Sequence, residues 1–160
     1  MTRVLITGMS GTGKSSVLSR LAELGYRTID TDDGDFTVEI QLESGTEHLW
    51  REERIQEVLS ATEADVIFIS GTCRNQVKFY PQFDHIVLLR APAPVLVDRL
   101  TTRSNNPYGK RPQELAVVTR FVETVEPMLR AAATLEIDTR APLDEVVWAI
   151  LQHVLECTHH

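Results

Sequence analysis

Eight consecutive residues near the start of the chain, Gly8 to Ser15, carry the clearest chemical signal. They read Gly-Met-Ser-Gly-Thr-Gly-Lys-Ser and match the pattern G-x-x-x-x-G-K-[ST] at every fixed position. An apolar stretch from Arg3 to Thr7 precedes them, and apolar residues recur at helical spacing from Val17 to Leu24. A glycine-rich turn between a strand and a helix surrounds an anion with backbone N–H groups and the positive end of the helix dipole. The pattern therefore predicts a phosphate-binding loop for a nucleoside triphosphate.

The residues of this loop have separate expected roles. The Lys14 ammonium can reach the β- and γ-phosphates, and the Ser15 hydroxyl can bind Mg²⁺. We therefore expect ATP and Mg²⁺ as cofactors, with Lys14 also acting in catalysis. The expected nucleotide-binding residues of the loop are Gly8, Ser10, Gly11, Thr12, Gly13, Lys14, Ser15 and Ser16.

Two carboxylates, Asp30 and Asp32, stand at the end of the second expected strand. Residues two apart on a strand point to the same side. One carboxylate there can hold Mg²⁺, directly or through water, while the other accepts a proton from an attacking hydroxyl. The alternative is an acidic turn that caps the next segment. The residues alone leave open which of the two carboxylates is the base.

The third expected strand ends in Ser70, followed by Gly71 and then by Arg74. Many P-loop hydrolases carry an Asp at this point, which binds Mg²⁺ and orients water. The guanine-reading motif [NT]-K-x-D and an S-G-G-Q-like signature are also absent from the sequence. These differences favour a small phosphotransferase over switch GTPases and mechanical ATPases. Gly71 and Arg74 are then expected to contact the phosphate acceptor.

Basic residues gather in two segments. A polar stretch from about 101 to 113 contains Arg103, and Arg99 lies just before it. Both arginines are expected to contact the nucleotide. This stretch is expected to be a lid whose Arg103 stabilises the transferring phosphoryl group, unless it is a solvated surface loop. Arg51 and Arg54 are three apart on an expected helix, so they either clamp an anionic acceptor or pair with neighbouring glutamates. Both readings stay open.

Apolar runs and helical spacing predict the elements that position these residues. Strands are expected at 3–7, 26–29, 66–69, 85–89 and 135–138. Helices are expected at about 14–24, 47–61, 92–100, 115–133 and 142–154, and 31–45 is expected to be a loop with room for one helical turn. Alternating strands and helices predict one three-layer α/β domain over 1–158, with an acceptor-binding segment at about 31–62.

Composition narrows the class of protein further. The chain has 160 residues, two cysteines far apart and a net charge of −7. An acidic chain is a poor nucleic-acid binder, and no apolar run is long enough to span a bilayer. We therefore expect a cytoplasmic monomer or homodimer that binds neither nucleic acid nor membrane. Residues 159 and 160 are histidines of the kind that a purification tag leaves.

The phosphate loop, Ile29 to Asp32, the Gly71 turn, the Arg99 and Arg103 segment and Ile137 to Thr139 together resemble the small P-loop kinases. That group includes shikimate, gluconate, adenylate and other nucleoside-monophosphate kinases. The chain also resembles small actinobacterial proteins described only as ATP-binding or AAA-family ATPases.

The resemblance implies a sheet in strand order 2-3-1-4-5, an acceptor-binding subdomain and a lid. It also implies that Asp30 assists Mg²⁺, that Asp32 faces the acceptor hydroxyl and that Arg103 is a lid arginine. The backbone around Thr139, Arg140 and Pro142 would border adenine.

Two departures leave the acceptor open. A shikimate kinase has a Gly-Gly-Gly turn after its third strand, where this chain has Gly71-Thr72-Cys73-Arg74, and an adenylate kinase has a longer lid. The expected activity is transfer of the γ-phosphate to a nucleoside monophosphate, a nucleoside, a sugar or a hydroxy acid. The alternative is a nucleotide-binding regulatory module that hydrolyses ATP only slowly.

Overall fold

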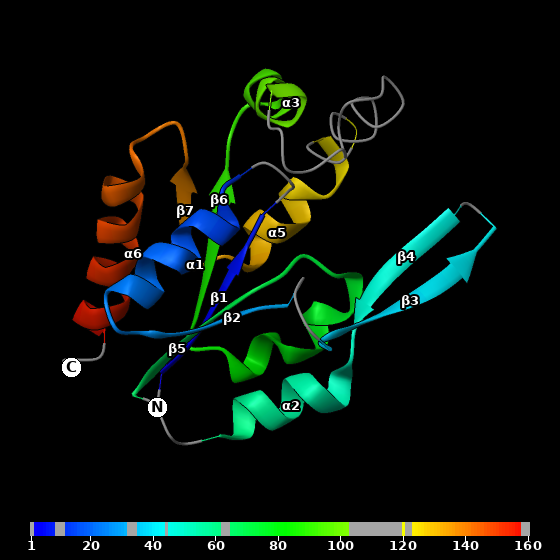
Figure 1. Cartoon of the computed structure of the whole chain (residues 1–160), viewed down its shortest axis with the longest axis horizontal. Helices are drawn as coiled ribbons and strands as arrows, with labels where there is room; N and C mark the ends of the chain where they lie inside the picture. The colour runs from blue at the N-terminus through cyan, green and yellow to red at the C-terminus, as the bar shows by residue number, and fades with distance from the viewer. Residues whose placement is uncertain are drawn as a thin grey trace.

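Five parallel strands form the sheet at the centre of the molecule (Figure 1). The computed structural model describes residues 2–8, 12–31, 35–43, 45–61, 65–102, 120 and 123–157. The sheet strands are β1 (Thr2–Thr7), β2 (Arg27–Asp30), β5 (Val66–Ser70), β6 (His85–Arg90) and β7 (Leu135–Asp138). All five lie where the apolar runs predicted strands. Because every pair is parallel, their carboxyl ends meet at one edge of the sheet.

The strand order is β2-β5-β1-β6-β7. Counted along the chain among the sheet strands alone, this is second, third, first, fourth and fifth, as expected. The labels differ from that count only because two hairpin strands intervene. β1 lies in the middle, and its Val4, Leu5 and Ile6 are fully buried. A strand covered on both faces needs apolar side chains in both directions, which explains the unbroken apolar runs.

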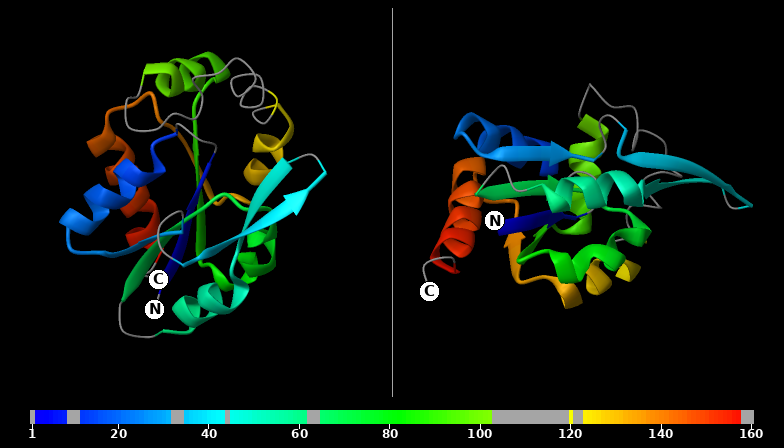
Figure 2. Two further views of the ribbon diagram at one scale, coloured as in Figure 1. Left: turned by 45° about the vertical axis from the view of Figure 1, so that its right-hand side comes forward. Right: turned by 90° about the horizontal axis from the view of Figure 1, so that it is seen from below.

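Helices cover both faces of this sheet (Figure 2). Val4 and Ile6 pack with α1 (Lys14–Glu23) and α6 (Leu143–Cys157) on one face. Leu5 points the other way and packs with α2 (Glu52–Ser60) and the 3-10 helix η1 (Arg74–Gln82). Two further helices, α3 (Ala93–Thr102) and α5 (Glu126–Ala132), pack around Leu88 and Leu96. The alternation of side chains along β1 thus builds the three layers.

The prediction for 31–61 is wrong in part, because an antiparallel hairpin occupies much of it. Its strands are β3 (Thr37–Leu42) and β4 (Gly45–Trp50), which project away from the sheet (Figure 2). Val38, Ile40 and Leu42 alternate with polar residues, a period of two that is typical of a strand. Helix α2 begins only at Glu52. The positions of Leu49 and Trp50 fit the period of a strand as well as that of a helix, so the expected helix began too early in the sequence.

Two expected segments fall partly outside the described residues. The helix expected over 115–133 is described at its C-terminal end, where α5 lies. The lid expected at 101–113 is described only at 101 and 102, the last residues of α3.

His85 makes the stability of this fold sensitive to pH. It begins β6, is 8% exposed and meets the ring of His153 edge-on, with ring centroids 5.0 Å apart. Burial, and then the charge of His153, lowers the pKa of His85 below its usual 6.5, against a smaller opposing effect of Asp84. Below pH 6.5 the unfolded chain therefore binds more protons at this position than the folded chain does. We expect the free energy of unfolding to fall as the pH is lowered from 7.5 to below 6.5. The contribution of His85 to this fall should end below the pKa that His85 has in the folded protein.

Urea unfolding midpoints measured across this pH range would check the expectation. His85→Phe keeps a ring at the same position, and its midpoint should fall less steeply with decreasing pH. The exposed His48 supplies the control, because His48→Gln should keep the parental pH dependence. An unchanged pH dependence in His85→Phe would contradict the role given to His85.

Candidate active site

The loop that joins β1 to α1 requires glycine at two described positions. Gly8 has a φ of +151° and Gly13 a φ of +90°, values that side-chain-bearing residues rarely adopt. A Cβ at Gly8 would also collide with the carbonyl oxygen of Leu89 on β6. The expected residues Ser10 and Gly11 lie outside the described residues. The two ends of the loop therefore have the backbone that a phosphate-binding turn needs.

Lys14 is the first residue of α1, and its side chain folds back over the loop. Its Nζ donates a hydrogen bond of 2.7 Å to the carbonyl oxygen of Gly8. A lysine in this position can reach the β- and γ-phosphates of a triphosphate bound to the loop. Lys14 would have to exchange this carbonyl for phosphate oxygens when a nucleotide enters.

The next residue, Ser15, meets a carboxylate from another strand. Its Oγ donates to Asp30 Oδ2 at 3.0 Å, while Ser70 Oγ donates to Asp30 Oδ1 at 3.4 Å. The ends of β2 and β5 and the start of α1 thus bring three oxygen-bearing side chains together. Oxygen ligands of this kind suit Mg²⁺, which keeps several waters and uses one or two carboxylates with substrate phosphates. Among the described residues there is no group of three or more His, Cys, Asp or Glu side chains that could hold a metal.

Beside the loop lies a cavity of about 260 Å³. Its lining residues are Thr12, Gly13, Ser16, Val17, Arg99, Thr139, Ala141, Leu143 and Val146. Arg99 reaches across from α3 and donates to the Thr139 hydroxyl at 2.9 Å and to the Thr139 carbonyl at 2.8 Å. The structure thereby brings together five of the residues expected to bind nucleotide, which come from the phosphate loop, α1, α3 and the segment after β7. The size and the apolar wall suit part of a nucleoside.

Two residues expected to border adenine, Arg140 and Pro142, do not line this cavity. Arg140 forms a 2.7 Å ion pair with Asp138, and this guanidinium lowers the pKa of Asp138 to about 2. The Pro142 carbonyl accepts hydrogen bonds from the backbone of Glu145 and Val146 at the start of α6. Their neighbours Ala141 and Leu143 line the cavity instead.

The arginines expected on the acceptor side are held by carboxylates of the chain itself. Their ion pairs are Arg51 with Asp35 at 3.1 Å, Arg54 with Glu57 at 2.9 Å, and Arg74 with Glu47 at 3.2 Å. Arg51 precedes α2 with an extended backbone, so the expected helical face shared with Arg54 is wrong. Exposed pairs of this kind contribute about 0–1 kcal/mol each. An anionic acceptor could therefore displace them at little cost.

Gly71, expected at the acceptor site, packs against Trp50. The indole is 2% exposed, and its Nε1 donates to Thr31 Oγ1 at 3.0 Å. Thr31 in turn donates to the Ser70 carbonyl at 2.6 Å. A Cβ on Gly71 would lie 2.6 Å from Thr31 Oγ1 and 2.7 Å from the Trp50 ring. This close approach explains the glycine, and Trp50 belongs to the core.

Replacement of Gly71 by alanine is expected to lower the free energy of unfolding by about 1–3 kcal/mol, the usual cost of overpacking. The added methyl group has to displace Trp50 or Thr31. Urea unfolding of Gly71→Ala gives the measurement. In the Trp50→Phe background, where the colliding part of the indole is gone, the same substitution should cost less. Equal costs in the two backgrounds would place the strain elsewhere.

Sequence reasoning missed two hydroxyl groups at this edge of the sheet. Ser70 was considered only as the replacement for a hydrolase carboxylate, yet it binds Asp30. Thr72 was not assigned a role, yet its Oγ1 donates to the Gly8 carbonyl. Ser70 ends β5 and Thr72 follows it two residues later, so their position at the end of a strand was the available signal.

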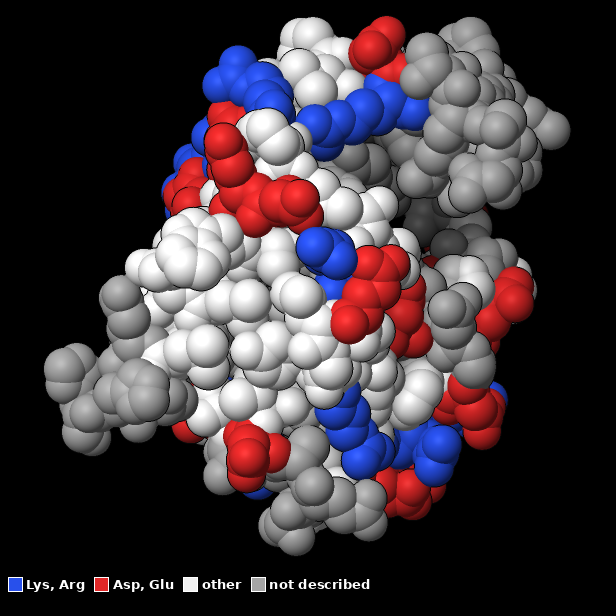
Figure 3. Space-filling model, turned by 60° about the vertical axis from the view of Figure 1, so that its left-hand side comes forward, with Lys and Arg blue, Asp and Glu red and all other residues white. Residues whose placement is uncertain are grey.

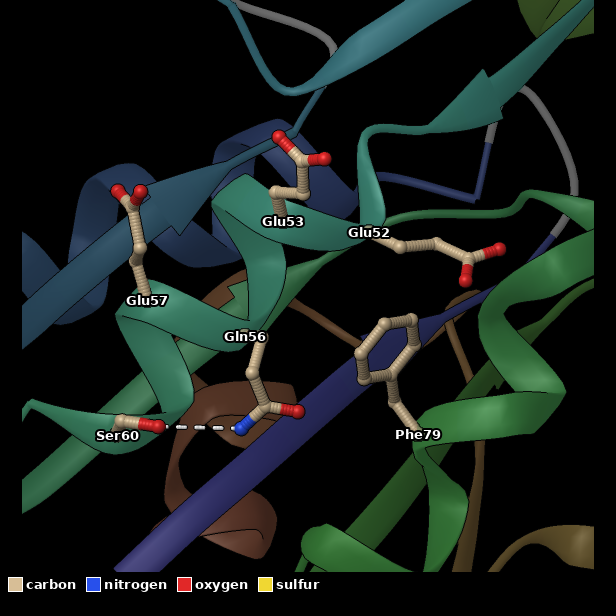
Figure 4. Close-up of a pocket in the computed structure, with 6 residues that line it drawn as sticks. All are labelled: Glu52, Glu53, Gln56, Glu57, Ser60 and Phe79. Atoms are coloured by element: carbon tan, nitrogen blue, oxygen red, sulfur yellow. Dashed lines mark hydrogen bonds between the residues drawn. The ribbon is translucent and has the colours of Figure 1, made fainter.

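A larger open pocket of about 550 Å³ lies between α2 and η1 (Figure 4). Its lining residues are Glu52, Glu53, Gln56, Glu57, Ser60 and Phe79, none of which the sequence placed in the site. Glu52 accepts a hydrogen bond from Lys78 at 3.0 Å, and this contact lowers the pKa of Glu52. Figure 4 shows Glu53 and Glu57 pointing away from the Phe79 ring. A carboxylate-rich groove repels phosphate groups, so we place no nucleotide chemistry there.

The face that includes α1 and α6 has no continuous basic surface on the part that Figure 3 colours by charge. Blue and red side chains there are interspersed around a broad uncharged area. Arg20 illustrates the pattern, with ion pairs to Glu23 at 2.9 Å and Asp144 at 3.1 Å. None of the described helices is both long and apolar enough to pass through a membrane.

A phosphate-binding turn after the central strand, a parallel sheet in this order and a Ser15–Asp30 contact at its edge define a P-loop protein with the fold of small kinases. The chain belongs to the AAA_18 family, described as an AAA domain, whose model matches residues 4–123. Among curated proteins, no sequence matches the chain.

Solved structures of small kinases share the fold over nearly the whole chain. Shikimate kinase from Acinetobacter baumannii, in complex with shikimate, is 18% identical with a TM-score of 0.67, covering 98% of this chain and 94% of the other. Shikimate kinase from Bacteroides thetaiotaomicron is 20% identical with a TM-score of 0.65, and the match covers 97% of this chain and 98% of the other. A gluconokinase from Sinorhizobium meliloti is 20% identical with a TM-score of 0.59, covering 99% and 98%. At these identities the likeness concerns the fold.

Proposed function

We propose that the protein transfers the γ-phosphate of ATP to a hydroxyl group of a small-molecule acceptor. The observation that carries this proposal is the contact of Ser15 with Asp30 at 3.0 Å, beside Lys14 and the cavity that contains Arg99. These residues supply a cation for the phosphates, oxygen ligands for a metal and a space for the nucleoside. Phosphoryl transfer depends almost entirely on such positioning and electrostatic stabilisation.

Each residue has a distinct task in the proposed reaction. The N–H groups of the loop and the Lys14 ammonium hold the β- and γ-phosphates and stabilise negative charge as the phosphoryl group leaves ADP. Ser15 and Asp30 would hold Mg²⁺, which when bound neutralises charge on the phosphate oxygens. Asp32 orients the acceptor hydroxyl and accepts its proton, and Arg103 stabilises the phosphoryl group during its transfer. The cavity beside Thr139 holds the nucleoside and keeps the triphosphate aligned with the phosphate loop.

Transfer is favoured over hydrolysis by the end of β5. The carboxylate that orients water in many P-loop hydrolases is replaced there by Ser70, which is 1% exposed and engaged with Asp30. The fold shared with shikimate kinases and a gluconokinase supports a small acceptor that bears a hydroxyl group. The segment after Asp30, which contains the β3–β4 hairpin, is then the acceptor-binding part of the chain.

A regulatory module that binds nucleotide and hydrolyses it slowly is the second candidate. It is favoured by the acceptor side, where Arg51, Arg54 and Arg74 each pair with a carboxylate of the same chain. A protein without an acceptor would need no free cation in that region. The two functions differ in one property, the stimulation of ADP release by an acceptor.

The deciding experiment is an acceptor screen with ATP and Mg²⁺, read as ADP release above the rate in the absence of acceptor. Nucleoside monophosphates, nucleosides, sugars and small hydroxy acids are the classes to include, and GTP should replace ATP in a parallel series. We expect at least one class to stimulate ADP release and to yield a phosphorylated product by mass spectrometry. Lys14→Ala serves as the inactive control. ADP release at the background rate with every class would overturn the kinase and favour the regulatory module.

A further inference from the structure

The carbonyl oxygen of Gly8 accepts two hydrogen bonds from different parts of the chain. One comes from Lys14 Nζ at 2.7 Å, and the other comes from the hydroxyl group of Thr72, two residues beyond the end of β5. A carbonyl oxygen has two lone pairs and can accept both donors at once. The two donors therefore share one acceptor at the entrance to the phosphate loop.

Gly8, which carries this carbonyl, lies in a crowded position. Gly8 is buried, its φ is +151°, and its Cα lies too close to the Leu89 carbonyl for a side chain to fit. Thr12 Oγ1 lies on the same side, 2.9 Å from the position of such a Cβ. This packing limits the movement of Gly8, and we take its carbonyl oxygen to keep its direction when a nucleotide binds.

Binding of a triphosphate changes the two donors unequally. Lys14 has to direct its ammonium toward the β- and γ-phosphates, whereas Thr72 carries no charge that the phosphates would attract. A partly buried carbonyl that loses its only donor costs more than the net value of the bond, since it is left desolvated. The Thr72 hydroxyl prevents this loss.

We propose that Thr72 is a positioning residue that keeps the Gly8 carbonyl bonded while Lys14 moves to the nucleotide phosphates. It lowers the cost of releasing Lys14 and so strengthens nucleotide binding without contacting the nucleotide. This inference rests on the proposed function only in its first half, the binding of ATP.

The test compares two substitutions of Thr72 by titrating ATP and Mg²⁺ in a calorimeter. Thr72→Val removes the hydroxyl and keeps the shape, and we expect the Kd for ATP to rise about tenfold, the value of one hydrogen bond of this kind. Thr72→Ser restores the donor and should recover most of the affinity. Thr2→Val, at the opposite edge of the sheet, is the matched control and should leave the Kd unchanged.

A double-mutant cycle separates positioning from direct contact. In the Lys14→Ala background the Gly8 carbonyl loses no donor on binding, so Thr72→Val should change the Kd by less than about twofold, the usual limit for uncoupled sites. A tenfold effect in both backgrounds would mean that Thr72 touches the nucleotide and would overturn the inference. So would a Thr72→Ser variant that binds as poorly as Thr72→Val.

A second measurement covers the case in which Lys14→Ala binds too weakly for titration. The nucleotide-free Thr72→Val protein should unfold at the parental temperature, because Thr72 is exposed and Lys14 still holds the Gly8 carbonyl. Only the rise in unfolding temperature on adding ATP and Mg²⁺ should shrink. A lower unfolding temperature without nucleotide would show a merely structural role. If the parent protein binds ATP but phosphorylates no acceptor, the proposed kinase activity is overturned and the role of Thr72 stands. If the parent protein does not bind ATP, both proposals are overturned.

Discussion

Lys14→Ala is expected to lower kcat/KM for phosphoryl transfer by on the order of 10²–10³-fold, the effect of losing one preorganised donor at a developing charge. The Lys14 ammonium lies 2.7 Å from the carbonyl oxygen of Gly8, the first residue of the loop. Without it, the negative charge on the transferring group meets only backbone N–H groups and the metal. Initial rates with the acceptor found in the screen would give the measurement.

Lys78 offers the control for this substitution. It lies on η1 and pairs with Glu52 at 3.0 Å, on the side of the larger acidic pocket. Lys78→Ala removes the same charge from the protein and should leave kcat/KM within about twofold of the parent, as expected for an independent site. Equal losses in the two variants would show that net charge matters and that Lys14 has no specific role.

Asp32→Asn is expected to lower kcat by about 10²–10⁴-fold, the usual contribution of a general base. The affinity for ATP should remain close to that of the parent, because this carboxylate is assigned to the acceptor and not to the nucleotide. Single-turnover rates measured beside calorimetric titration of ATP would separate the two effects. Asp32 lies outside the described residues, so its role comes from the sequence alone.

Asp30→Asn is the informative companion variant. Asp30 is held by Ser15 and Ser70, as a metal-binding carboxylate at the head of the phosphate loop would be. The asparagine amide of the variant should raise the Mg²⁺ concentration needed for half-maximal activity, and excess Mg²⁺ should restore part of the rate. If Asp32→Asn turns over normally while Asp30→Asn loses activity at every Mg²⁺ concentration, the base is Asp30.

The sheet and the phosphate loop were readable from the chain for a simple reason. A strand buried on both faces must be apolar throughout, so runs such as Val66–Ile69 stand out from the polar segments around them. The loop depends on backbone conformation, and glycine is the residue that permits a φ such as the +90° of Gly13. Both signals are local, and neither requires knowledge of a distant partner.

The hairpin and the acceptor side were harder because short apolar patterns fit more than one period. Leu49 and Trp50 are compatible with a helix or a strand, and only pairing of β4 with β3 decides between them. The partner of Arg51 was not foreseen for the same reason. Asp35 precedes β3 and Arg51 follows β4, so the pairing of the two strands brings them together.

Local patterns in the chain thus determined that a phosphate loop follows a buried strand, and that Asp30 follows the next strand along. The tertiary structure alone decided that Ser15, Asp30 and Ser70 meet, and that Thr72 and Lys14 share the Gly8 carbonyl. The physical reason is the crossover of the parallel sheet. It places the end of β5 between β1 and β2, so residues about 40 to 64 positions apart in the chain come within hydrogen-bond distance.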